Sequence, residues 1–225
     1  NNIKKSIYAI PEITGKQVSN FNIIGCPGCY PTSILFPLIP LLRSKAIYTN
    51  NIIIDSKSGY SGAGRGVHKK YENKNLYESL SAYGVGFHRH NSEIEQEFKK
   101  HYKSKINFTF TPHLTPMFKG ILSTIYLDLK MGFSINKIQN ILKKFYEKNK
   151  FVKVLKTNSL LSTNNVINSN YIHISICKTK YKGKVIILSA LDNLIKGGAG
   201  QAVQNMNIKY KLNYDEGLKW KFLYS

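Results

Sequence analysis

The chain has 225 residues, of which 42% are hydrophobic, so it can bury a core in one large domain or two small ones. No apolar run reaches the ~18 residues of a membrane helix, and the polar residues 1–5 lead into no apolar segment, so we expect neither a membrane span nor a secretory signal. The few cysteines, Cys26, Cys29 and Cys177, exclude a disulfide framework and indicate a reducing compartment, which predicts a cytoplasmic protein.

The formal net charge of +21 raises the question of a nucleic-acid partner. The lysines are spread along the whole chain, however, and no zinc-finger, RRM or KH signature accompanies them. We interpret the charge as a biased composition on a solvated surface and expect no nucleic-acid partner. A basic nucleic-acid-binding protein stays open as an alternative, because the positive field is real whatever its origin.

In chain order, residues 21–25 predict a short buried strand, and the turn 26–32 leads into an apolar helix over 33–42 that Pro37 and Pro40 end or kink. A second strand over 51–56 precedes the glycine-rich loop 58–66. The remaining predicted elements are a helix from a capping box at Ser92–Glu95 to about residue 103, strands over 106–111 and 119–130, a helix over 134–149, strands over 171–178 and 184–191 joined by a turn at 182–183, and a helix over 198–210. Adjacent strands favour a mixed or antiparallel sheet with helices on it.

The turn G-C-P-G-C-Y-P-T at 25–32 carries the first candidate site. A strand delivers Cys29 to the start of a helix, where the partial positive charge of the helix end lowers the pKa of a thiol and favours the nucleophilic thiolate. The alternative is a buried structural cysteine. Cys26 and Cys29 also form a C-x-x-C, which fits a redox pair or half a zinc site, although no second closely spaced cysteine pair exists.

The segment His88-Arg89-His90 lies on the loop before a predicted helix. An imidazole titrates near neutral pH, so either histidine suits acid–base chemistry, and the alternative is a surface histidine pair. His113 in T-P-H-L-T-P at 111–116 is flanked by prolines and can simply cap a strand.

Two glycine-rich segments suit close approach of a ligand to the backbone. The loop 58–66 has small residues and Arg65, which can pair with phosphate, whereas the alternative is a flexible turn. The segment 192–207 is a strand end, a glycine turn and a helix, which suits a cofactor at a helix start or is an ordinary glycine-led helix. Neither matches a P-loop or a G-x-G-x-x-G pattern.

Together these segments resemble the N-acetyl-gamma-glutamyl-phosphate reductase family. The matching motifs, in the same order, are P-G-C-Y-P-T at 27–32, S-G-x-S-G-A-G-R at 58–65, H-R-H-x-x-E-I at 88–94, P-H-L-x-P-M-x-x-G-I-L at 112–122 and D-N-L-x-K-G-x-A-G-Q-A-V-Q-N-M-N at 192–207. The resemblance spans nearly the whole chain. It implies an α/β protein whose α+β catalytic domain is of the glyceraldehyde-3-phosphate dehydrogenase-like type, with a mixed sheet and helices.

The resemblance also implies the chemistry: NADPH-dependent reduction of N-acetyl-glutamyl 5-phosphate to the 5-semialdehyde and phosphate through a cysteine thioester, in arginine biosynthesis, by a homo-oligomer. The resemblance places the nucleophile at Cys29, which alone precedes Y-P-T. We expect His90 as the acid–base group, with His88 as the alternative. The other expected site residues are Gly62, Ala63, Asn193 and Gly197 at the nicotinamide end of NADPH, and Arg65, Arg89 and His88 on the substrate's phosphate or carboxylate. No metal is expected.

The chain departs from the family in two places. Cys26 stands where the family usually has Asn, and the family's opening G-x-x-G-Y-x-G turn, which holds the cofactor's phosphates, does not occur. We therefore expect residues 1–28 to end a dinucleotide-binding domain that is mostly missing, 29–190 to form the catalytic and dimerisation domain, and 191–225 to return as a helical segment to the first domain. On this view the alternative to an enzyme is a non-catalytic remnant that keeps the dimerisation fold.

Overall fold

A seven-stranded mixed sheet lies at the centre of the computed structural model, which describes residues 2–63 and 78–219. The strand order is β4-β5-β3-β6-β9-β8-β7. The bounds are β3 Ile52–Gly59, β4 Ser81–Ala82, β5 Phe108–Thr115, β6 Ile121–Asp128, β7 Val152–Val154, β8 Ile172–Lys178 and β9 Lys184–Leu191. β3 runs parallel to β5 and β7 parallel to β8, and the other neighbouring pairs are antiparallel. The predicted mixed sheet with helices is confirmed.

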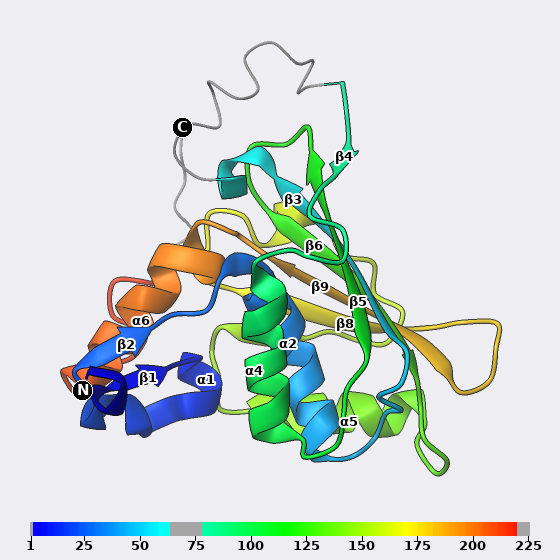
Figure 1. Ribbon diagram of the computed structural model, residues 1–225, viewed down its shortest axis with the longest axis horizontal. Helices are drawn as coiled ribbons and strands as arrows, with labels where there is room; N and C mark the ends of the chain where they lie inside the picture. Colours follow the sequence, from blue (N-terminus) through cyan, green and yellow to red (C-terminus); the bar gives the residue numbers. More distant parts are fainter. Residues whose placement is uncertain (1, 64–77, 220–225) are drawn as a thin grey trace.

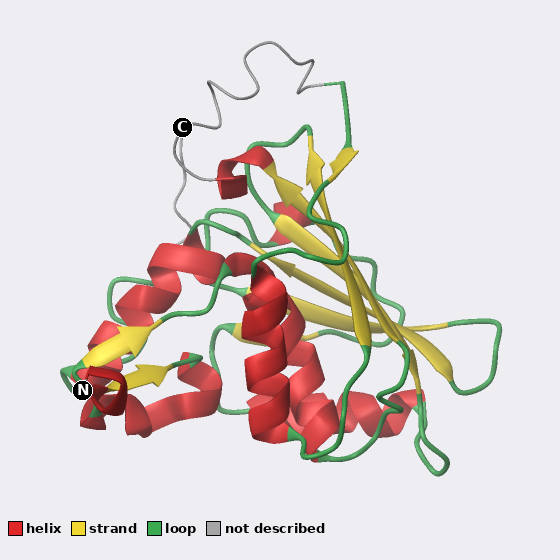
Figure 2. Cartoon of the chain, in the orientation of Figure 1, coloured by secondary structure: helices red, strands yellow, loops and turns green. Residues whose placement is uncertain are grey.

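Three helices cover one face of this sheet, namely α2 (Cys29–Arg43), α4 (His90–His101) and α5 (Ile135–Tyr146). In the described part of the chain no helix covers the opposite face (Figure 1, Figure 2). Burial alternates accordingly along β3, where Ile52 and Ile54 are buried under the helices and Ile53 is exposed. No described helix is both long and apolar enough to cross a membrane.

The N-terminal segment and α6 lie together beside the helical layer. β1 (Ser6–Tyr8) pairs in parallel with β2 (Ile23–Gly25) in a separate two-stranded sheet, and α1 (Pro11–Thr14) and α6 (Gly200–Lys209) pack nearby (Figure 1). Short turns complete the structure: 3-10 segments Asn2–Lys5, Gly15–Asn20, Tyr60–Ala63 and Thr163–Asn165, and a π-type turn Ile195–Ala199. The two-stranded sheet falls wholly within residues 1–28, while the domain boundaries themselves stay a prediction.

Pro37 and Pro40 were predicted to end or kink the apolar helix. They do not end it, because α2 runs through both prolines to Arg43. All residues from Tyr30 to Leu42 are buried, and this packing outweighs the low helix propensity of proline. Pro40 has no N–H for the carbonyl of Phe36, four residues earlier. The hydroxyl of Tyr146 on α5 donates to that carbonyl at 2.7 Å and replaces the missing bond.

The predicted capping box at Ser92–Glu95 is also wrong. α4 begins at His90 after Arg89, and the hydroxyl of Ser92 donates to the Arg89 carbonyl instead of capping the helix. The predicted strand over 21–25 exists as β2, but Ile23 and Gly25 are exposed rather than buried. The remaining predicted helices and strands are present with shifted ends, whereas the short elements β1, α1, β4 and β7 were not predicted.

Candidate active site

Cys29 is the first residue of α2, directly after the N-cap Gly28. Two groups hold the Gly28 peptide from opposite sides. The Thr32 hydroxyl donates to the Gly28 carbonyl at 2.8 Å, and the Gly28 N–H donates to Glu93 Oε1 at 2.7 Å. The turn that presents Cys29 is therefore fixed by hydrogen bonds to both α2 and α4.

Glu93 is a site residue that sequence reasoning missed, because its position two residues into a supposed capping box suggested a local role. Its Oε1 also accepts a hydrogen bond from the Tyr8 hydroxyl on β1 at 2.6 Å. One carboxylate thus ties β1, the Cys29 turn and α4 together. The signal was present in H-R-H-x-x-E-I, where the glutamate lies one helical turn after His90.

Gly197 lies against Cys29 from the other end of the chain. A β-carbon built on Gly197 would lie 2.6 Å from Cys29 Cβ and 2.9 Å from Cys29 Cα. Only glycine leaves room for this contact. The structure therefore places Gly197, which the resemblance assigned to the cofactor, directly beside the candidate nucleophile.

His90 is the histidine that lies beside the Cys29 turn. A β-carbon built on Gly28 would lie 2.5 Å from His90 Nε2, so the imidazole packs on the backbone that precedes Cys29. His88 lies behind it: its Nδ1 accepts the His90 N–H at 3.2 Å, and its ring meets those of Tyr30, Tyr83 and Phe110. The Arg89 side chain between them is exposed.

Burial favours the neutral form of both the thiol and the imidazole. Burial raises the pKa of the Cys29 thiol to about 11, and this outweighs the lowering by the backbone N–H groups of Tyr30 and Cys29. Burial, followed by the neighbouring His88 and Arg89, lowers the pKa of His90 to about 4. The helix start acts in the predicted direction, but the expectation of a partly ionised resting thiol is wrong because burial is the larger effect.

Two of the predicted cofactor residues, Gly62 after β3 and Asn193 after β9, come together. A β-carbon on Gly62 would lie 3.0 Å from Ser58 Oγ and 3.5 Å from Asn193 Nδ2. The buried Asn193 side chain accepts from the Gly120 N–H at 2.6 Å and donates to Ser61 Oγ at 3.0 Å. Ala63 ends the short turn after β3, and Arg65 lies outside the described residues.

Cys26 has a structural contact of its own, since its sulfur accepts a hydrogen bond from Asn205 Nδ2 on α6 at 3.4 Å. Cys177 lies away from this turn on β8. Within residues 2–63 and 78–219, no group of three or more histidine, cysteine or acidic side chains is arranged to hold a metal ion. The zinc interpretation of C-x-x-C therefore has no further ligands in that part of the chain.

Comparison with known proteins decides the family. The profile described as "Semialdehyde dehydrogenase, dimerisation domain" matches residues 29–193. The chain belongs to this family. The match begins at Cys29 and ends at Asn193, so it contains the seven-stranded sheet, its helices and the histidine segment.

Several curated relatives that match most of the chain are named N-acetyl-gamma-glutamyl-phosphate reductase. The chain is 45% identical over 214 residues to N-acetyl-gamma-glutamyl-phosphate reductase of Thermoanaerobacter pseudethanolicus, which covers 95% of the chain and 62% of the relative. It is 47% identical to the protein of the same name from Geobacter metallireducens, over 97% of the chain and 63% of the relative. A probable chloroplastic N-acetyl-gamma-glutamyl-phosphate reductase of Arabidopsis thaliana is 44% identical over 95% of the chain and 53% of its own length. The chain thus spans less than two thirds of these relatives.

A solved structure confirms the fold. Aspartate semialdehyde dehydrogenase II from Vibrio cholerae superposes with a TM-score of 0.72 over 92% of this chain and 69% of that chain, at 14% identity. A probable aspartate-semialdehyde dehydrogenase from Pseudomonas aeruginosa gives a TM-score of 0.69 over the same share of both chains, at 15% identity. At 14% and 15% identity these two likenesses show the fold. The family match and the names of the relatives favour the semialdehyde dehydrogenase family over a nucleic-acid-binding protein.

Proposed function

We propose that the complete protein reduces the acyl phosphate N-acetyl-glutamyl 5-phosphate to the 5-semialdehyde and phosphate, as a step of arginine biosynthesis. The observation that carries the proposal is the setting of Cys29, at a helix start with the His90 imidazole on one side and Gly197 on the other. The relatives named N-acetyl-gamma-glutamyl-phosphate reductase supply the substrate class.

The first step is attack of the Cys29 sulfur on the acyl carbon, which forms a thioester and expels phosphate. Because the thiol has a pKa of about 11 and the imidazole one of about 4, a resting thiolate–imidazolium pair is disfavoured. We infer that His90 takes the proton as the sulfur attacks, in general-base fashion, rather than beforehand. Hydride addition leaves an oxyanion, to which the protonated His90 donates. When the carbonyl forms, His90 takes that hydroxyl proton back and passes it to the leaving Cys29 sulfur, while solvent protonates the released phosphate.

NADPH supplies the hydride that reduces the thioester when it is bound. The described residues fit a nicotinamide in part. Gly62 is a position without a side chain beside Asn193, where a ring can approach the backbone, whereas the space at Gly197 is taken up by Cys29. Asn193 fits a structural role better than contact with the cofactor. Its amide oxygen and nitrogen already form hydrogen bonds within the chain, to Gly120 and Ser61.

The substrate's anionic groups need cationic partners, and we propose Arg89 for this role, with His88 as a neutral hydrogen-bonding neighbour. Arg89 is exposed beside His90, so its guanidinium is free to form the paired hydrogen bonds that phosphate and carboxylate accept. Arg65 is proposed for the same role on the sequence motif alone.

The proposed reaction is tested with the complete protein, enzymatically generated N-acetyl-glutamyl phosphate and NADPH. Oxidation of NADPH should match the aldehyde formed, and substrate without NADPH should leave an acyl mass on the peptide that contains Cys29. Succinyl phosphate and aspartyl phosphate serve as comparison substrates. Faster reduction of aspartyl phosphate than of the N-acetyl-glutamyl compound would overturn the substrate assignment, and acyl mass elsewhere would overturn the nucleophile.

Replacing His90 by alanine should lower kcat by about 10²–10⁴-fold, because the proton acceptor is removed.

The pH dependence of stability gives an independent readout of the same variant. The pKa of His90 falls from 6.5 to about 4 on folding, so its neutral form contributes stability that is present above pH 6.5 and is lost as the pH falls through about 4. Denaturant unfolding of both proteins from pH 7.5 to pH 4 should show the wild-type advantage shrinking on acidification. If the difference is independent of pH while His88→Ala abolishes turnover, the two histidine roles must be exchanged.

We also propose that the protein self-associates through the face of the sheet that no described helix covers. Ile53 on β3 lies opposite Tyr126 on β6, and Tyr126 lies opposite Ile186 on β9. Ile53 and Tyr126 are each 42% exposed, so the three form an apolar stripe across neighbouring strands. The family description "dimerisation domain" supports the same assembly.

Tyr126→Lys should therefore shift the protein to a smaller species in sedimentation velocity, because it places a charge in the apolar stripe. Met131→Lys is the matched control, since Met131 is 92% exposed in the turn after β6. Raising the salt concentration should strengthen association of the wild type, as it screens the repulsion between copies of net charge +21. An unchanged assembly in Tyr126→Lys would exclude this face.

A further inference from the structure

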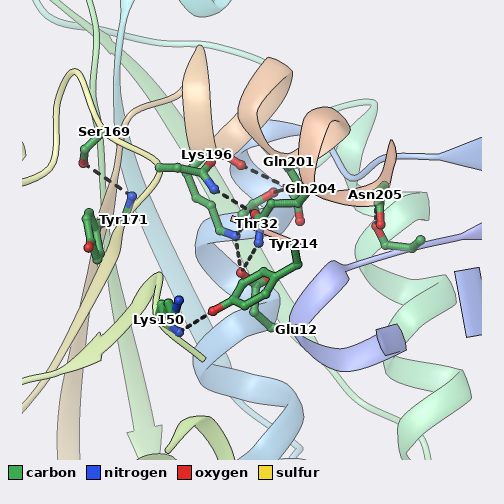
Figure 3. A network of polar contacts seen from close by, with 12 residues as sticks. Glu12, Thr32, Lys150, Ser169, Tyr171, Lys196, Gln201, Gln204, Asn205 and Tyr214 are labelled. Atoms are coloured by element: carbon green, nitrogen blue, oxygen red, sulfur yellow. Dashed lines mark hydrogen bonds and ion pairs between the residues drawn. The ribbon is translucent and has the colours of Figure 1, made fainter. Parts of the chain in front are cut away.

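Lys196 is a fully buried cation close to the Cys29 turn, and the proposed chemistry does not use it. Its ammonium donates to Glu12 Oε1 on α1 at 2.5 Å and to Gln204 Oε1 on α6 at 2.7 Å (Figure 3). The Lys196 and Glu12 side chains have no exposed surface. Lys196 therefore cannot touch a substrate, and any functional role must act through its neighbours.

Further hydrogen bonds surround this ion pair. Gln204 Nε2 also donates to Glu12 Oε1 at 3.0 Å, and Asn170 Nδ2 donates to Gln204 Oε1 at 2.9 Å. The ammonium lies 5.1 Å from the ring centre of Phe36 on α2 and 5.8 Å from that of Phe151 before β7. One cation thus joins α1, α2, α6 and the segment that leads into β7.

Two routes lead from Lys196 to Cys29. The first is covalent, because Gly197 is the next residue and lies against Cys29. The second is a chain of hydrogen bonds. Gln201 Nε2 donates both to the Lys196 carbonyl at 3.1 Å and to Thr32 Oγ1 at 3.0 Å, and Thr32 Oγ1 donates to the carbonyl of Gly28.

Stability alone does not account for a lysine at this position. The free-energy cost of removing two charges from water offsets much of their electrostatic attraction. An apolar pair of the same volume therefore often stabilises a core equally well. Burial lowers the pKa of Lys196, while Glu12 opposes that shift and favours the charged form. Unlike an apolar pair, the charged pair makes directional hydrogen bonds, and each of these bonds fixes one element relative to the others.

We infer that Lys196 is a positioning residue for the reaction, which holds Gly197 and the Gly28 turn in the arrangement that presents the Cys29 sulfur. The inference rests on the proposed function insofar as Cys29 is the nucleophile. It extends that function to a residue that contacts neither substrate nor cofactor. Misplacing a reacting atom by about 1 Å lowers a rate by up to about 10²-fold, so small shifts of the turn are enough.

The test uses Lys196→Met in the complete protein, which removes the ammonium and keeps an unbranched side chain. We expect kcat to fall by about 10- to 100-fold, with KM within about twofold of wild type. The pH midpoint for alkylation of Cys29 by iodoacetamide should also move, because the backbone N–H groups that favour its thiolate shift relative to the sulfur. Peptide mass spectrometry separates Cys29 from the other two thiols.

Two further variants keep the test decisive. Gln201→Leu cuts the bonds to Lys196 and Thr32 without leaving a buried charge, and it should lower kcat by about tenfold even if Lys196→Met fails to fold. Ile138→Ala empties a fully buried site on α5, away from the network, and should lower the melting temperature with kcat and alkylation unchanged.

A wild-type kcat and alkylation midpoint in either folded variant overturns the inference. A loss of kcat in Ile138→Ala as large as in Lys196→Met also overturns it, because the effect is then general destabilisation. Failure of the proposed function has a different signature, namely retained turnover in Cys29→Ser. The alkylation profile of Lys196→Met would still report on positioning in that case.

Discussion

Cys29→Ser is expected to lower kcat for acyl-phosphate reduction by at least about a thousandfold while the fold stays intact. A serine hydroxyl is a far weaker nucleophile than a thiol near neutral pH, and its acyl ester is a poorer hydride acceptor than a thioester. The buried setting increases the difference, because it disfavours any anion at this position and already raises the pKa of the thiol to about 11. Circular dichroism and turnover on the same preparation measure both parts of the prediction.

Cys26→Ala is the matched control for this variant. Its sulfur receives one long hydrogen bond, from Asn205 Nδ2 at 3.4 Å, so its loss should change kcat by less than about threefold. If Cys29→Ser keeps substantial turnover and Cys26→Ala loses it, the nucleophile is the other cysteine of the C-x-x-C. If both variants keep turnover, thioester chemistry at this turn is excluded.

Local patterns predicted most of the fold because the periodic elements are long. The alternating strands 106–111, 119–130 and 184–191 appear as β5, β6 and β9, and the helix predicted over 134–149 appears as α5. The failures lie where distant contacts override local rules. α2 contains two prolines in its interior because its whole length is buried and Tyr146, far along the chain, satisfies the carbonyl that Pro40 leaves free.

The candidate site shows the same limit more sharply. Residues 29, 90 and 197 come from three separate segments, and no local period brings them together; only the family resemblance named them jointly. Sequence reasoning set the thiol's pKa from the helix start alone, whereas the packing of distant segments around Cys29 decides it. Glu93 was assigned to its own helix, although its bonds go to Gly28 and Tyr8. Side chains that link separate segments are therefore the part of a site that cannot be predicted from a single sequence.

The packing around Cys29 depends on two glycines that play different parts. Gly28 makes room for the His90 ring on one side of the turn, and Gly197 makes room for Cys29 itself on the other. Both contacts involve atoms that cannot swing away, since one neighbour is a packed imidazole and the other is the start of a helix. The sulfur's position is therefore set by residues from three regions of the chain.

Gly197→Ala is accordingly expected to damage both stability and turnover. The new β-carbon would lie 2.6 Å from Cys29 Cβ, 2.9 Å from Cys29 Cα and 3.2 Å from Leu191 Cδ1. Neither residue can move without breaking structure. Cys29 is the first residue of α2, and the Gly197 N–H donates to the Asp192 carbonyl at 2.9 Å. We expect a loss of about 1–3 kcal/mol in the free energy of unfolding and a fall of about 100-fold in kcat.

The matched control is Gly25→Ala, whose added β-carbon would meet only the carbonyl of Ile7 at 3.7 Å, an ordinary contact. It should leave kcat and stability near wild type. The same pair of variants separates the two roles open to Gly197. If Gly197 mainly packs on Cys29, then Gly197→Ala lowers kcat and leaves the dissociation constant for NADPH unchanged in calorimetric titration. If it mainly faces the nicotinamide, the dissociation constant rises while alkylation of Cys29 keeps its wild-type rate. We predict the first result, because the contact with Cys29 already fills the space that a side chain at Gly197 would occupy.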